Sequence, residues 1–234
     1  LQQLAPKHLA RLNQIDRIKK GQLKMQFNDN HKSNGSNVIL MDSGVDTQHP
    51  DLSGRCKNVG DVIDLNGHGT AIAGVIASDT FGVCKKCTIV SYACFDKFGK
   101  SNLIQIIKTF QSIVQNEPKG GVIVMPFYSA YNGLLNDVVE KISDSGYAMI
   151  TAAGNDGLNA CLYSPASSNK VLTVGSLNVY TDNITDFSNF GQCVDVYADG
   201  LDIVTLDTAE NGVTIKSGTS LSCAIGAGLV ANFI

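Results

Sequence analysis

The sequence lacks several features that would assign it to a membrane or nucleic-acid class. No apolar run reaches the roughly 20 residues that a membrane-spanning helix needs, and the short apolar stretch 224–234 predicts a buried helix instead. No charge of one sign dominates, since 18 Lys and Arg stand against 21 Asp and Glu. Without a broad basic surface we expect no nucleic-acid partner. The basic residues near the start are interpreted as a solvated surface; they are Arg11, Arg17, Lys19, Lys20 and Lys24.

The chain also lacks internal repeats, low-complexity linkers and a targeting segment. It begins at Leu1 with no Met, no basic n-region and no apolar h-region, so we expect any signal peptide to lie outside this sequence. A length of 234 residues suits one α/β domain. With 44% hydrophobic and 17% charged residues the composition is that of a folded globular protein. We therefore expect one domain over residues 1–234.

Cysteine is present in an intermediate amount. There are seven, at positions 56, 84, 87, 94, 161, 193 and 223. That number is high for a cytosolic protein and low for a disulfide-built miniprotein. Because it is odd, at least one thiol stays free or pairs between chains. Two N-glycosylation sequons, Asn34-Gly-Ser36 and Asn183-Ile-Thr185, add to the case for the secretory pathway or a vacuolar lumen.

Short apolar runs alternate with amphipathic segments along the chain. The runs are continuous and do not alternate with polar residues, which is typical of strands covered on both faces of a parallel sheet. They cover 38–41, 88–93, 122–125, 148–152, 171–174 and 194–197, and the expected helices cover 69–78, 102–115, 134–143 and 220–233. The alternation predicts a doubly wound, mostly parallel α/β sheet flanked by helices.

Two polar residues stand where such a sheet places its chemistry, at the carboxyl ends of strands and the starts of helices. Asp42 follows the apolar run 38–41, and His68 lies between two glycines just before a helix. Taken singly, Asp42 suits a turn that closes a strand and His68 suits a helix start. His68 is nevertheless the histidine framed for access, because flanking glycines let another chain approach closely.

Ser220 and Asn155 complete the set. Ser220 opens an apolar helix, where a serine is commonly a cap; the helix N-terminus would also stabilise an oxyanion formed beside it. Asn155 follows the strand 148–152, as a turn residue or as a second oxyanion donor. Each of the four residues alone has an ordinary structural interpretation, and these four interpretations are independent of one another. One catalytic set explains all four residues together, and their order along the chain, Asp, then His, then Ser, is that of subtilisin.

With these residues the sequence resembles the subtilases, and within them the proteinase K-like branch, over essentially its whole length. The matching stretches are Met41-Asp-Ser-Gly-Val-Asp46, His49-Pro-Asp-Leu52, Asn66-Gly-His-Gly-Thr70, Ala152-Ala-Gly-Asn155, Tyr163-Ser-Pro-Ala-Ser167, Ser217-Gly-Thr-Ser220 and the N-terminal Ala5-Pro-Lys-His-Leu-Ala-Arg11.

The resemblance implies a serine endopeptidase in which Asp42, His68 and Ser220 form a triad and Asn155 helps to bind the oxyanion. It also implies an extended polypeptide substrate, a prodomain that inhibits and assists folding, and a monomer that requires no cofactor. The substrate-contacting residues would be Gly99, Lys100, Ser101, Leu103, Phe127, Tyr128, Ser129, Ala152, Ala153, Gly154 and Thr219.

Further features are implied by the resemblance or left open by the residues. The resemblance implies a Cys161–Cys193 disulfide and a structural calcium at Asn169, Val171 and Asp195, although the family has proline where Asn169 stands. Cys84 and Cys87 are expected to form a local disulfide or to remain two thiols, in preference to a redox or zinc motif. Cys223 is expected to be a small buried residue.

The sequence departs from the family pattern at three places. Ser220 is followed by Leu-Ser-Cys-Ala-Ile in place of Met-Ala-Thr-Pro-His, and residues 126–130 read Pro-Phe-Tyr-Ser-Ala where glycines are usual. The added side chains predict a narrow or blocked pocket for the residue before the scissile bond. The sequence stops at Ile234, which suggests a truncated C-terminal end. These departures favour a second hypothesis, a pseudoprotease that binds a peptide or protein partner without turnover. A broad-specificity esterase is disfavoured because the serine lacks a Gly-x-Ser-x-Gly setting.

Overall fold

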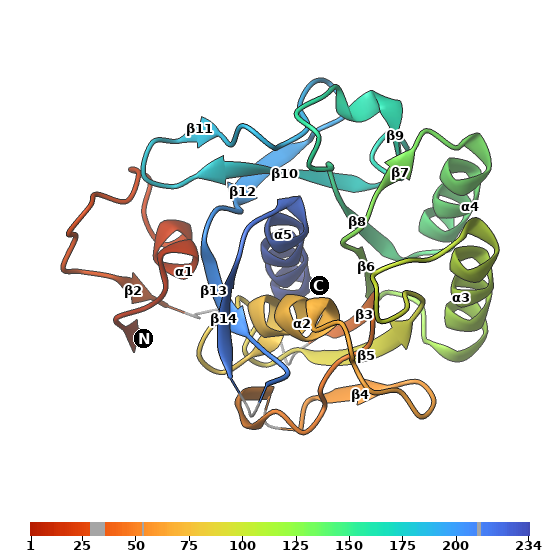
Figure 1. The fold of residues 1–234 in the computed structure, drawn as a ribbon, viewed down its shortest axis with the longest axis horizontal. Coiled ribbons are helices and arrows are strands. Elements are labelled where there is room, and N and C mark those ends of the chain that lie inside the picture. The colour runs from red at the N-terminus through yellow and green to blue at the C-terminus, as the bar shows by residue number, and fades with distance from the viewer. Residues whose placement is uncertain (29–35, 53, 210–211) are drawn as a thin grey trace.

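The computed structural model describes residues 1–28, 36–52, 54–209 and 212–234. At its centre lies a mostly parallel sheet of strand order β11-β10-β8-β6-β3-β5-β4, with β12 also paired to β10 (Figure 1). Its strands are β3 (Asn37–Asp42), β4 (Cys56–Asn58), β5 (Thr88–Ala93), β6 (Val122–Met125), β8 (Ala148–Ala152), β10 (Leu172–Asn178), β11 (Asn183–Ile184) and β12 (Val196–Asp199). The predicted fold class is confirmed.

Helices cover both faces of this sheet, which explains the continuous apolar strands. Val38 and Leu40 of β3 pack in one core cluster with residues of α2 (His68–Ala77) and α5 (Thr219–Phe233). Ile39 and Met41, which point to the opposite face, pack with α3 (Leu103–Asn116) and α4 (Gly133–Asp144). A run without polar residues is thus required because neither face meets water.

The α5 helix approaches the sheet closely because small residues line it. A Cβ added at Gly226 would lie 2.9 Å from Val174 Cγ2, and one at Gly228 would lie 2.7 Å from Val83 Cβ. A larger residue at Gly226 would push α5, which carries Ser220, away from β10, and one at Gly228 would push it away from the loop that holds Val83. The glycines therefore help to set the depth of that serine in the molecule.

The remaining elements lie around this core. They are α1 (Lys7–Leu12), the short pairs β1 (Gln2–Gln3) with β2 (Gln26–Phe27) and β7 (Ser129–Ala130) with β9 (Tyr163–Ser164), the hairpin β13 (Ile203–Leu206) and β14 (Val213–Lys216), and the 3-10 turns η1 (Pro50–Leu52) and η2 (Ala160–Leu162). No helix within the described ranges is long and apolar enough to cross a membrane.

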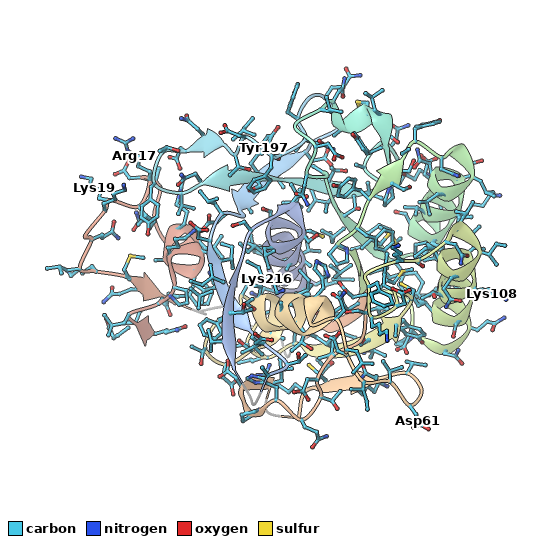
Figure 2. The ribbon with its side chains drawn as sticks, in the orientation of Figure 1. Arg17, Lys19, Asp61, Lys108, Tyr197 and Lys216 are labelled. Atoms are coloured by element: carbon cyan, nitrogen blue, oxygen red, sulfur yellow. A yellow bond between two sulfur atoms is a disulfide. The ribbon has the colours of Figure 1, made fainter. Side chains whose placement is uncertain are left out.

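Element boundaries differ from the sequence expectation mainly beyond β8. The strand expected at 171–174 runs on to Asn178, and the strand expected at 194–197 is shifted to Val196–Asp199. The first extends because residues 177 and 178 pair with β11, and the second begins later because the Val194 N–H donates to Gly191 O in a turn. The short strands and α1 carry too little periodic pattern to be predicted. Side chains of the early basic segment, such as Arg17 and Lys19, extend outward at the edge of the molecule (Figure 2).

Candidate active site

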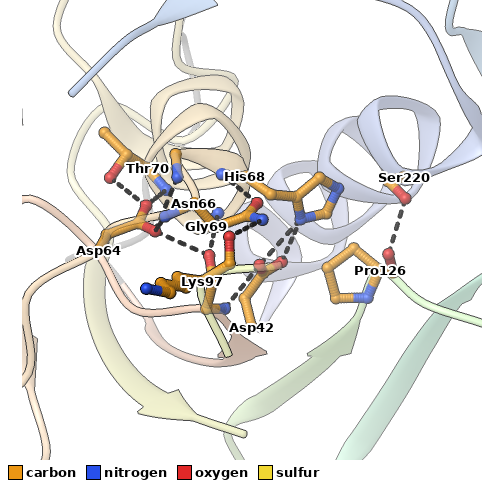
Figure 3. A network of polar contacts seen from close by, with 11 residues as sticks. Asp42, Asp64, Asn66, His68, Gly69, Thr70, Lys97, Pro126 and Ser220 are labelled. Atoms are coloured by element: carbon orange, nitrogen blue, oxygen red, sulfur yellow. Dashed lines mark hydrogen bonds and ion pairs between the residues drawn. The ribbon is translucent and has the colours of Figure 1, made fainter. Parts of the chain in front are cut away.

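The candidate residues gather at the carboxyl end of the sheet. Asp42 is the last residue of β3, Pro126 follows β6 and Asn155 follows β8, while His68 and Ser220 lie in the first turns of α2 and α5. Because parallel strands end at the same edge, residues more than 170 positions apart in the sequence meet there (Figure 3).

Asp42 and His68 form a closely coupled pair. The imidazole Nδ1 lies 2.8 Å from each carboxylate oxygen of Asp42, and Asp42 is only 3% exposed. The Ser43 N–H donates to the same carboxylate at 2.7 Å. This leaves Nε2 of His68 as the nitrogen free to exchange a proton, and Figure 3 shows that edge of the ring turned toward Ser220.

The electrostatic environment favours the charged form of His68. Burial lowers the pKa of the imidazole, but the charge and the hydrogen bond of Asp42 outweigh it, so that the pKa lies above its usual 6.5. Lys216 opposes this rise and Asp64 adds to it weakly. An imidazole of this kind is well suited to take a proton and hold it while Asp42 compensates the charge.

Asp64 anchors the loop before His68 and was not singled out from the sequence. Its buried carboxylate accepts from the Ser43 hydroxyl (2.9 Å), the Asn66 and Gly67 N–H groups (3.1 and 2.8 Å), and both the N–H (2.9 Å) and hydroxyl (2.7 Å) of Thr70. A negative charge at the start of α2 also suits the helix dipole. The signal in the sequence was an aspartate two residues before Asn66, in the position of an Asx turn.

Ser220 is placed beside this pair but bonded elsewhere. It is 7% exposed, and its hydroxyl donates to the Pro126 carbonyl at 2.7 Å. Between the described residues Ser220 and His68 no hydrogen bond is present. The nucleophile candidate therefore lies at the predicted helix start, with its proton directed at a backbone oxygen.

Asn155 is oriented by Thr219. Its Oδ1 accepts from the Thr219 N–H at 2.8 Å and the Thr219 hydroxyl at 2.9 Å, while that hydroxyl also accepts from the Gly154 N–H at 3.1 Å. With the oxygen so engaged, Nδ2 is the side of the amide left to donate to another group. A Cβ at Gly218 would lie 3.5 Å from Nδ2, so Asn155 faces the start of α5.

The predicted substrate walls stand on two sides of the cleft. Gly99 and Phe127 both border a cavity of about 190 Å³ beside His68. Gly99, Lys100 and Ser101 are exposed in the loop before α3 and Leu103 is half-buried. Ser129 belongs to β7, which pairs with β9. Ala152, Ala153, Gly154 and Thr219 are buried around Asn155, and Tyr128 lies against Gly154.

The structure also shows how the cysteines pair and where the sequon within the described residues lies. Cys161 is bonded to Cys193, the pair implied by the resemblance, and Cys84 is bonded to Cys87, which settles the open alternative as a local disulfide. Cys56, Cys94 and Cys223 are free and buried. Asn183 is exposed in β11, whereas Asn34 lies outside the described residues.

The residues suggested for calcium gather only in part. The Asp195 carboxylate accepts from the Thr173 N–H at 2.8 Å, so it lies beside the strand that follows Val171. The Asn169 N–H donates to Glu140. Within the described ranges no three acidic, His or Cys side chains form a metal-binding group. One carboxylate already engaged by a backbone N–H is a weak calcium site, and the ion stays a prediction.

Comparison with known proteins agrees with this geometry. The family model described as "Subtilase family" matches residues 33–234. "Subtilisin-like protease 2" of Pseudogymnoascus destructans is 36% identical over 217 residues, covering 88% of this chain and 53% of that protein. "Proteinase T" of Parengyodontium album is 34% identical, covering 88% and 73%. The crystal structure of a cold adapted subtilisin-like serine proteinase superposes with a TM-score of 0.91 at 30% identity, covering 98% of this chain and 84% of that one. The matched region covers 52–53% of three curated fungal relatives, so the chain spans about half of their length.

Proposed function

This chain belongs to the subtilase family, and from that premise we propose that it is the catalytic part of a serine endopeptidase. The observation that carries the proposal is the placement of His68 Nδ1 at 2.8 Å from both oxygens of the buried Asp42 carboxylate, with Ser220 on the other side of the ring. A carboxylate, an imidazole and a hydroxyl in that sequence provide an orienting group, a base and a nucleophile.

The reaction assigns one role to each member of the triad. Ser220 Oγ attacks the carbonyl carbon of the scissile peptide bond while its proton passes to Nε2 of His68. Asp42 holds the ring by Nδ1 and compensates the charge of the imidazolium. His68 then gives the proton to the leaving amine, and a water molecule repeats the cycle to release the acyl group from Ser220.

The oxyanion of the tetrahedral intermediate would be bound at the start of α5. The Asn155 Nδ2 is the side-chain donor left free by the two bonds to Thr219, and the Ser220 N–H is the backbone donor at the helix N-terminus. Donors fixed before the reaction stabilise the developing charge without reorganising.

The proposed substrate is a polypeptide bound in an extended conformation between the loop 99–103 and residues 127–130. We place the protein in the secretory pathway or a vacuolar lumen, with its own prodomain as inhibitor and a monomeric state. The two disulfides and the exposed Asn183 support that compartment, because disulfides persist in oxidising environments.

Digestion of an unfolded protein tests the proposal. The native chain should cut reduced, alkylated casein into peptides seen by mass spectrometry, and Ser220→Ala at the same concentration should leave it intact. Cutting that survives Ser220→Ala would assign the cleavage to another group or a contaminant.

A second candidate function rests on the Ser220–Pro126 hydrogen bond. If that bond persists in solution, the chain would bind extended peptides without cutting them. The native protein would then fail to digest casein yet bind its fragments as tightly as Ser220→Ala does, as measured by isothermal titration calorimetry.

A further inference from the structure

Tyr128 fills space beside the two groups proposed to bind the oxyanion. A Cβ placed on Gly154 would lie 3.1 Å from Tyr128 Cδ2, so ring and backbone are in close contact. The ring meets Tyr163 edge-on, with centroids 5.6 Å apart. The Asn155 backbone and the Asp156 carboxylate lie near its hydroxyl.

These contacts hold the phenol as a fixed wall. Burial raises the pKa of Tyr128; the Asn155 backbone bond lowers it and Asp156 raises it again. The phenol therefore stays protonated and uncharged at neutral pH. A half-buried tyrosine that packs against the Gly154 backbone and meets the Tyr163 ring edge-on has little freedom to turn aside.

The position of this wall matters because of where a substrate must lie. The substrate carbonyl group attacked by Ser220 has its oxygen at Asn155 Nδ2. The side chain of the same substrate residue starts at the carbon atom bonded to that carbonyl group. It must therefore run along the wall formed by residues 152–155, where the ring of Tyr128 lies. A hydrogen atom or a methyl group needs little of this space, whereas a benzyl group needs the volume that the phenol takes.

Space remains on the opposite side of the site. The cavity beside His68 measures about 190 Å³ and is bordered by Phe95, Phe127, Pro126 and Gly99, with the two phenylalanine rings 5.1 Å apart. Side chains alternate in direction along an extended peptide. The residue that precedes the one at Gly154 thus points toward this cavity, whose aromatic lining favours an apolar group.

We infer that Tyr128 is a specificity-determining residue, which restricts the residue before the scissile bond to Gly or Ala and leaves apolar selection to the residue preceding it. The inference rests on the proposed function and names its substrate class. It predicts that the site accepts only a small side chain beside Asn155 and prefers an apolar side chain beside His68.

Peptide panels test this with the matched variants Tyr128→Ala and Tyr131→Ala, the second being a rim tyrosine that is 62% exposed. Chromogenic peptides differing only before the scissile bond carry Gly, Ala, Leu or Phe. The native chain and Tyr131→Ala should favour Gly and Ala, and Tyr128→Ala should raise kcat/KM for Phe relative to Ala by about tenfold or more. Tyr128→Phe should keep the native preference, because the ring remains. In a second panel the preceding residue is Val or Asn, and Val should be cut faster.

Two readouts separate this inference from the proposed function. Fluorophosphonate labelling of Ser220 reports whether the triad works. Binding of peptides ending in Phe or Ala to Ser220→Ala and to the double variant with Tyr128→Ala reports the space alone, so it decides the inference even without turnover. Preference of the native chain for Phe, or an unchanged Phe-to-Ala ratio in Tyr128→Ala, would overturn it, as would equal rates for Val and Asn.

Discussion

The two sides of the cleft hold their reactive groups differently. On the side of β3 and α2, Asp42 and Asp64 accept a dense set of hydrogen bonds from the segments around His68, and the imidazole is fixed by both oxygens of Asp42. On the side of β6 and α5, the Ser220 hydroxyl donates a hydrogen bond to the Pro126 carbonyl. Pro126 is followed by two bulky residues, Phe127 and Tyr128.

The two sides of the cleft are therefore constrained differently, the acid–base side by the contacts of Asp42 and the nucleophile side by those of Ser220. The acid–base side needs fixed geometry, because the proton must move between defined atoms. The side that receives the substrate can change its shape and so its selectivity, provided that Ser220 and Asn155 remain within reach of one carbonyl group.

The strongest way to break the acid–base side is His68→Ala. Without the imidazole no base can take the Ser220 proton during the attack, and we expect kcat to fall on the order of 10⁶-fold, a loss known for the corresponding change in subtilisin. Because the His68 side chain is 34% exposed, the urea unfolding curve should change little. Steady-state rates on a peptide substrate and circular dichroism check both parts. A loss below tenfold in a folded variant would remove His68 from the mechanism.

Asp42→Asn weakens the same side while keeping its shape. We expect kcat to fall by roughly 10⁴-fold, as for the equivalent change in another serine protease triad. Only neutral His68 can accept the Ser220 proton, so kcat/KM of the native chain should fall as the pH drops through a pKa above 6.5. Without the negative charge that raises this pKa, the variant's acidic limb should move to lower pH. A pH profile of kcat/KM with an unmoved limb would contradict the assigned coupling.

Asn155→Ala tests the nucleophile side. Loss of one oxyanion donor should lower kcat about 10²- to 10³-fold with KM nearly unchanged, a magnitude established for a related subtilisin. Asn155→Asp is the sharper control, since its oxygens keep the bonds to Thr219 while the donor is gone. Because Asn155→Asp also adds a negative charge that repels the oxyanion, its loss should be at least as large as that of Asn155→Ala, and full activity in Asn155→Asp would exclude the donor.

Asp64→Ala should have the smallest effect on the chemical step and act on stability. Removal of a buried carboxylate leaves several N–H and O–H donors without an acceptor, and we expect the free energy of unfolding to fall by about 3 kcal/mol. Urea denaturation measures it. Asp61→Ala, at an exposed aspartate on the surface (Figure 2), is the matched control and should change little. Similar stability of both variants would show that the Asp64 network is not needed to hold the loop.

Much of the fold and of the candidate site could be predicted because it depends on local sequence patterns. Continuous apolar runs marked β5, β6 and β8 to the residue, and the glycines around His68 marked an accessible helix start. The role of Asp64 could not be predicted, because it depends on donors from Ser43 and Thr70 that meet only after folding. The hydrogen bond of Ser220 could not be predicted either. The sequence around Ser220 indicated a nucleophile, but the oxygen that accepts its hydroxyl proton belongs to Pro126, which lies 94 residues away. The direction of the Tyr128 side chain could not be predicted, because it depends on packing against residues that are distant in the sequence.

Labelling by a fluorophosphonate probe of the native chain, Ser220→Ala and His68→Ala decides whether Ser220 is a nucleophile activated by His68. We expect stoichiometric labelling of the native chain, mapped by mass spectrometry to Ser220, with none in Ser220→Ala and a severe slowing in His68→Ala. Absence of labelling in the folded native protein would show that Ser220 is not an activated nucleophile and would leave the Ser220–Pro126 bond as the resting state of a peptide-binding protein.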